Sequence, residues 1–232
     1  MVTLQQIEEK FDFTFPEYFK RLWNDGMLNY MRGFEEGLKE GETWVDTVYP
    51  TLQENPPVLL HSGEAQLTLL TPDAMLNFET PAFWDVDTHH FIPFAKTLEG
   101  NYYAFYDNVK VDGEAPIVEI WDEMDDTEYY AKNFEDFIVR QMVESAEDID
   151  KDDLKVEYGG DVNAYIADVE RDIKSITPYL KAGYTQLLKE IYSKEPKEGT
   201  LAYSLISMRE AEKIVEEYLD FELMGESFSH EI

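Results

Sequence analysis

Apolar residues recur every three or four positions over the first 25 residues, and this spacing predicts two short helices. Thr3 and Gln6 make a capping-box pattern at the start of the first helix. Pro16 fits the first turn of the second helix, where its missing N–H costs no hydrogen bond. From about residue 42 the pattern changes to short β-branched or aromatic runs separated by Pro, Gly and Asn, which is typical of strands.

The strongest strand candidates are residues 91–96, 101–106 and 115–121, and a Gly-containing turn between the first two predicts a hairpin. Asn133 then fits the N-cap of a helix with one apolar stripe. We therefore expect residues 1–143 to form an α+β domain, in which an antiparallel sheet of about five or six strands has helices packed on one face.

The rest of the chain has a different pattern. Residues 144–160 are rich in acids and end in Gly-Gly, which predicts an acidic linker. Helical spacing returns in residues 161–232, where Asp161 and Ser207 fit N-cap positions. We expect this part to be a C-terminal helical extension docked on the first domain.

The charge balance limits the partners. The chain has 19 Lys and Arg against 50 Asp and Glu, so its formal net charge is 19 − 50 = −31. Direct binding of nucleic acid or of an anionic membrane is disfavoured, because both need clustered cations. The charge favours a basic protein partner, although strong hydration of the surface explains it equally well.

The chain has no cysteine, which excludes disulfides and thiolate chemistry. Its first residues lack the basic and apolar regions of a signal peptide, and no apolar run reaches the roughly 20 residues that span a bilayer. We therefore expect a cytoplasmic protein, and no motif calls for a cofactor.

Four segments together resemble a known family. FTFPEYFKRLWNDG is similar to its first-helix signature, and FIPFAKTLEGNYYAFYDN to its central hairpin. APIVEIWDE and NFEDFIVRQM are similar to its last strand and closing helix. The family is the SUKH superfamily, which includes the fungal Smi/Knr regulators and many bacterial immunity proteins.

This resemblance implies an α+β domain, over about residues 1–143, that binds a protein and is not an enzyme. It implies an immunity protein that neutralises a cognate toxin domain, often a nuclease, or else a regulatory or scaffold adaptor of the Smi/Knr type. Together with the charge of the chain, it makes a basic toxin domain the expected partner. No binding residues carry over, because the partners of the family vary.

Asp85, Asp87 and His89 are the one cluster with metal-ligand chemistry, since alternation would place all three on one strand face. They make a metal-dependent hydrolase a third hypothesis. The alternative is a polar loop before the strand at 91–96.

Two segments are candidates for binding a partner, because each combines acids with aromatic or Met anchors and has no cation. Residues 121–130 are the first and residues 83–87 the second; the alternative for the first is a solvated loop that follows the last strand, with Trp121 buried. The candidate residues are Trp84, Asp85, Asp87, Asp122, Glu123, Asp125, Asp126 and Glu128.

Overall fold

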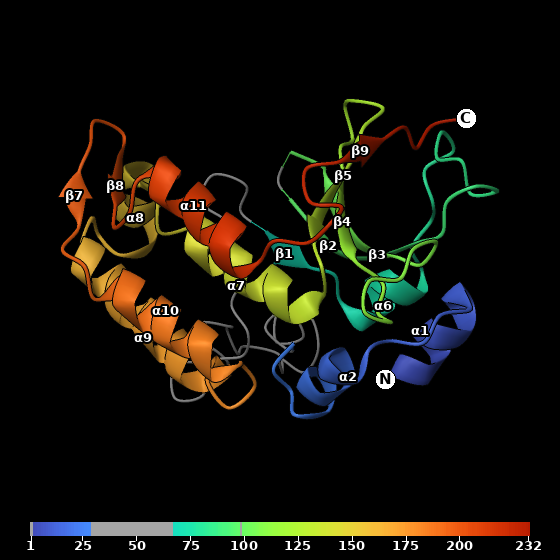
Figure 1. Ribbon diagram of the computed structural model, residues 1–232, viewed down its shortest axis with the longest axis horizontal. Helices are drawn as coiled ribbons and strands as arrows, with labels where there is room; N and C mark the ends of the chain where they lie inside the picture. Colours follow the sequence, from blue (N-terminus) through green and yellow to red (C-terminus); the bar gives the residue numbers. More distant parts are fainter. Residues whose placement is uncertain (1, 29–66, 98) are drawn as a thin grey trace, which may run out of the picture. The chain divides into compact units, whose positions relative to one another are not determined.

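The computed structural model describes residues 2–28, 67–97 and 99–232 (Figure 1). The chain divides into two compact units. Unit 1 comprises residues 1–24, 67–137 and 219–232, and unit 2 comprises residues 25–66 and 138–218. The strands predicted between residues 42 and 66 lie outside the described residues.

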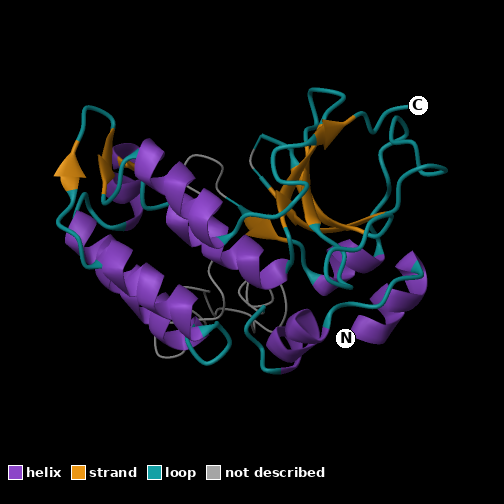
Figure 2. Ribbon diagram, viewed as in Figure 1, coloured by secondary structure: helices purple, strands orange, loops and turns teal. Residues whose placement is uncertain are grey.

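Unit 1 is an α+β fold built on a six-stranded antiparallel sheet with the order β1-β2-β3-β4-β5-β9, as Figure 2 shows in orange. The sequence therefore predicted the fold class correctly. The strands are β1 Thr68–Leu69, β2 Phe91–Lys96, β3 Tyr102–Tyr106, β4 Ile117–Ile120, β5 Thr127–Ala131 and β9 Ser227–Phe228. The helices are α1 Leu4–Phe11, α2 Glu17–Asn24, α6 Pro72–Leu76 and the first turn of α7 Phe134–Glu144.

One face of the sheet packs against these helices through aromatic rings. Phe105 of β3 lies at the centre and is fully buried. Rings from the N-terminal segment, from β2 and from α7 have centroids 5.1–5.8 Å from it. They belong to Phe13, Phe15, Phe19, Phe94 and Phe134. The predicted capping box at Thr3 and Gln6 is present at the start of α1.

The opposite face of the sheet is also buried, but by irregular chain. Ala104 and Tyr106 alternate with Phe105 along β3 and so point to this side, where they join Trp84, Phe91 and Tyr129 in a second core. Residues 219–228 complete it. Their contributing side chains are Phe221, Leu223, Met224 and Phe228.

Two predicted boundaries differ from the structure. Residues 127–131 form β5, although the sequence suggested a loop. The short alternating run was missed because several acids directly precede it. Residues 144–160 were expected to be a linker, but they contain β6 Ile149–Asp150 and α8 Lys151–Glu157. Asp150 caps that helix by accepting hydrogen bonds from Asp152 N and Asp153 N.

Unit 2 combines helices with a small antiparallel sheet of order β6-β8-β7. Asp161 caps α9, and Ser207 and Glu210 exchange hydrogen bonds at the start of α11. Its further elements are α9 Val162–Ile176, α10 Ala182–Tyr192, β7 Lys197–Glu198, β8 Ala202–Ser204 and α11 Met208–Tyr218. The extension expected at 161–232 is thus helical in its main part, whereas its last 14 residues belong to unit 1. The docking of the extension stays a prediction.

Candidate functional site

The two acidic segments picked out by sequence meet through the end of the chain. Asp125 Oδ2 accepts a hydrogen bond from Ser229 Oγ (2.6 Å), and its Oδ1 accepts from the backbone N–H groups of His230 (2.8 Å) and Glu231 (2.9 Å). On the other side, the N–H of Asp85 donates to the carbonyl of His230 (2.8 Å). Residues 229–232 therefore tie residues 83–87 to residues 121–126, and we call these three segments of unit 1 the composite face.

The N–H of Ile232 also donates to the carbonyl of Phe83 (3.1 Å), and Trp84 and Glu231 form an isolated antiparallel bridge. The composite face is thus held by backbone hydrogen bonds as well as by the Asp125 carboxylate. The chain separation between the joined residues exceeds 100 positions, so the arrangement depends on the fold and has no local sequence signal.

The composite face combines exposed apolar side chains with carboxylates. Phe83 is 39% exposed, Val86 62%, Met124 52% and Ile232 91%, and these are four of the eight exposed large hydrophobic residues in the described part of the chain. The same three segments carry seven acids and neither Lys nor Arg. Exposed apolar groups with a charged rim are typical of protein interfaces.

Trp84 does not belong to this exposed set. Its side chain is only 3% exposed and packs edge-on against Phe91 and Tyr102, with centroid distances of 5.4 and 5.7 Å. The sequence therefore identified a core residue as a candidate partner contact. An aromatic residue beside acids carries no local information about which side of the chain faces solvent.

Asp85 and Asp125 use their carboxylates within the fold. Asp85 Oδ1 accepts from Asp87 N (3.2 Å) and Thr88 N (3.1 Å) and so caps a turn. Hydrogen bonds lower the pKa of both carboxyls, chiefly from Thr88 in the first case and from the Ser229 hydroxyl in the second. Both groups stay ionised at neutral pH, and both position the face.

The remaining candidates divide by exposure. Asp87, Asp122 and Glu123 are exposed, and Asp126 is half-buried. Glu128 lies inside β5, opposite Ser227 of β9 and Glu119 of β4. It is half-buried on the sheet surface that carries the helices, so the fold does not add it to the exposed rim.

The structure does not assemble the candidate metal ligands. The His89 ring stacks on Phe91 and Phe228, with centroids 5.5 and 5.1 Å away, and its Nδ1 lies 2.9 Å from the hydroxyl of Tyr106. The carboxylate of Asp85 already accepts hydrogen bonds from the N–H groups of Asp87 and Thr88. Across residues 2–28, 67–97 and 99–232, no group of three or more His, Asp or Glu side chains has the arrangement to hold a metal ion.

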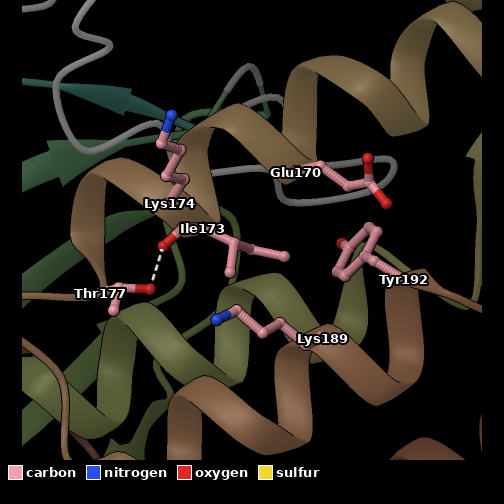
Figure 3. Close-up of a pocket in the computed structure, with 6 residues that line it drawn as sticks. All are labelled: Glu170, Ile173, Lys174, Thr177, Lys189 and Tyr192. Carbon is pink, nitrogen blue, oxygen red and sulfur yellow. Dashed lines mark hydrogen bonds between the residues drawn. The ribbon is translucent and has the colours of Figure 1, made fainter.

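A separate pocket of about 390 Å³ lies in unit 2 between α9 and α10 (Figure 3). The hydroxyl of Thr177 donates to the carbonyl of Ile173 (2.6 Å), and that of Tyr192 donates to the carbonyl of Met142 (2.8 Å). Burial raises the pKa of Tyr192 well above its ordinary value, so this hydroxyl stays neutral. The described lining residues are Glu170, Ile173, Lys174, Thr177, Lys189 and Tyr192.

No helix in the described part of the chain is long and apolar enough to cross a membrane.

The fold and the composite face together fit a non-catalytic binding module. The profile of the SMI1 / KNR4 family (SUKH-1) matches residues 2–140, which is more than half of the chain, and the chain belongs to this family. The match covers most of unit 1, including the sheet from β1 to β5, and ends before residues 219–232. Comparison with curated proteins and with solved structures gives no significant match.

Proposed function

We propose that this protein is an immunity protein, which binds a cognate bacterial toxin domain through the composite face and blocks it. The observation that carries the proposal is the face itself, where four exposed apolar side chains lie among seven carboxylates with no cation. Membership of the SMI1 / KNR4 family supports a binding role.

The chemistry of the face favours a basic partner. Apolar side chains supply the area that a partner desolvates, and the surrounding carboxylates set orientation and encounter rate. A nuclease domain carries a basic cleft for a polyanion. Exposed carboxylates such as Asp87, Asp122 and Glu123 supply negative charge that could occupy such a cleft. In this proposal the complex forms in the cytoplasm, and the net charge of −31 accelerates it.

The direct test is co-expression with the toxin domain encoded next to this gene. The protein should protect the cells and form a complex with that domain. Undiminished toxicity would remove the toxin from the proposal. A complex with a basic partner that is not a toxin would favour the adaptor role instead.

Charge reversal tests the surface. Asp87→Lys/Glu123→Lys changes two exposed acids of the composite face, and Glu195→Lys/Glu216→Lys changes two exposed acids of unit 2 by the same net charge. We expect the first pair to slow association about tenfold at low ionic strength, because nearby charges steer encounter, and the second to slow it much less. Equal effects of both pairs would mean that the composite face is not the binding site.

A further inference from the structure

His230 is the residue on which the composite face closes. Its side chain is fully buried, its N–H donates to Asp125 (2.8 Å), and its carbonyl accepts from the N–H of Asp85 (2.8 Å). The ring is near the aromatic rings of Phe83 and Trp84, whose centroids are 6.3 and 6.0 Å away. One residue thus contacts both acidic segments through its backbone and the core through its side chain.

The environment of the ring suits only the neutral imidazole. Nδ1 lies 2.9 Å from the hydroxyl of Thr127, whereas Nε2 is buried and has no hydrogen-bond partner among the described residues. In the neutral ring Nε2 can remain a bare acceptor. Protonation would make it a charged N–H donor with no acceptor, which is costly in a buried site.

Four titratable groups influence the charge state of the ring. The turn between β4 and β5 contributes Asp125 and Asp126, the loop before β2 contributes His89, and Glu231 follows in the chain. The three acids favour the protonated ring, whereas His89 and burial oppose it. Burial is the largest influence, and the pKa of His230 is lowered.

The segment that holds His230 has a short ladder connection to the sheet. Among the described residues it enters the sheet through β9, an edge strand of two residues that pairs with β5, so its position depends largely on the buried ring of His230, on Phe228 and on the Asp125 hydrogen bonds. Edge segments with few ladder bonds open at low free energy. The position of the segment should therefore respond to a single unfavourable charge.

We propose that His230 is a pH-sensitive lock, whose neutral ring holds residues 227–232 in place and whose protonation releases them and takes the composite face apart. The consequence for partner binding rests on the proposed function, since the same face is the proposed contact surface. Partner binding should then weaken as the pH falls below about 6.5, in proportion to the fraction of protein in the open form.

The sign follows from proton linkage. In the open segment the imidazole has its ordinary pKa of about 6.5, and in the closed segment the pKa is lower. The open form therefore binds more protons, so closure is fully favoured above pH 6.5 and weakens as the pH falls below it. Between pH 7.5 and 5.5 the opening equilibrium should rise, and the ordinary pKa of the imidazole in the open form limits this rise to about tenfold.

Amide hydrogen exchange on the free, full-length protein tests the lock. The amides of Asp85, His230, Glu231 and Ile232 are hydrogen-bonded only while the segment is closed. After correction for intrinsic exchange, their protection should fall from pH 7.5 to 5.5, by at most about tenfold. Protection that is equal at both values overturns the proposal.

Two variants isolate the imidazole. His230→Asn keeps an amide within reach of Thr127 but cannot titrate, so it should lose the pH dependence. His90→Asn removes another imidazole of unit 1, one that contacts the carbonyl of Phe11 and lies beside Asp107, and should keep the dependence. A His230→Asn variant with unchanged pH dependence contradicts the lock.

The wild-type protein supplies a second measurement, in case the substitution opens the segment at every pH. NMR titration of the His230 ring should give a midpoint below 6.5, and a midpoint at or above 6.5 overturns the proposal. These measurements need no partner. If the protein does not bind the toxin domain at any pH, the proposed function is refuted, but the pH dependence of the segment at residues 227–232 is not.

Discussion

Truncating Trp84 to Ala should destabilise unit 1 by about 3 kcal/mol. An aromatic side chain of this size buries on the order of 200 Å², which at about 25 cal/mol per Å² corresponds to about 5 kcal/mol. That figure is an upper bound, because the unfolded chain already buries part of the ring, and measured losses for Trp→Ala are about 3–5 kcal/mol. The ring is 3% exposed and has four aromatic neighbours at centroid distances of 5.4–6.0 Å.

The indole N–H decides where in this range the loss should fall. Nε1 of Trp84 is buried without a hydrogen-bond partner among the described residues. Removing it recovers a desolvation cost of about 1–3 kcal/mol, which places the expected loss at the low end. For the same reason Trp84→Phe should cost less than half as much as Trp84→Ala.

The assay is urea unfolding followed by far-UV circular dichroism, with exchange of the β2 and β3 amides to assign the transition to unit 1. Phe83→Ala is the matched control, because Phe83 is the next residue and is 39% exposed; we expect a loss below about 1 kcal/mol. A loss below about 1 kcal/mol for Trp84→Ala would refute the core assignment. Equal losses for Phe and Ala at position 84 would show that the indole N–H makes a bond that the fold needs.

Three further outcomes follow from the described contacts. In thermal unfolding, Gly100→Ala should lower the stability more than Gly113→Ala does. Both glycines have positive φ (107° and 90°), so both substitutions strain the backbone. Only at Gly100 would the added Cβ also come within 3.0 Å of the Asp122 carboxylate. Hydrogen bonds from Ser207 lower the pKa of Glu210 to about 2. The stabilisation of the start of α11 by this carboxylate should therefore be fully present above pH 4.5 and be lost as the pH falls through about 2. The titration midpoint of the Glu210 carboxyl, measured by NMR, checks this, and a midpoint near 4.5 contradicts it. Association with a basic partner should slow markedly as salt rises, because charge attraction is screened over about 8 Å at physiological ionic strength, while dissociation changes less; an association rate that is independent of salt would mean that the charge serves solubility alone.

Local patterns were sufficient where neighbours in the sequence are neighbours in the fold. The predicted strand at residues 91–96 coincides with β2, and the predicted hairpin turn leads into β3. Both follow from β propensity and a Gly turn within 20 residues. The N-caps at Asp161 and Ser207 are equally local, since each cap bonds to backbone within three positions.

Local sequence patterns could not predict the elements that depend on residues far apart in the chain. β9 is two residues long and is defined by β5, about 100 positions earlier, so no local pattern could show it. The contacts of His230 are equally distant in the sequence, since Thr127 and Asp125 lie more than 100 positions before it. Composition identified the acidic segments, but only the fold showed that Trp84 is buried. It also showed that Asp85 accepts hydrogen bonds within its own turn and that Asp125 binds residues 229–231.

The sheet of unit 1 has a consequence for synthesis. Its second face is closed by residues 219–232, which leave the ribosome 219 − 137 = 82 positions after the preceding stretch of the unit. At the usual elongation rate of about 5–20 residues per second, the interval is about 4–16 s. Throughout it, the rings of Trp84, Phe91 and Tyr129 face solvent and the β5 edge has no partner strand, as in sheets that aggregate. The nascent chain is therefore at its most vulnerable just before residues 219–232 emerge, and chaperones should engage it at that stage.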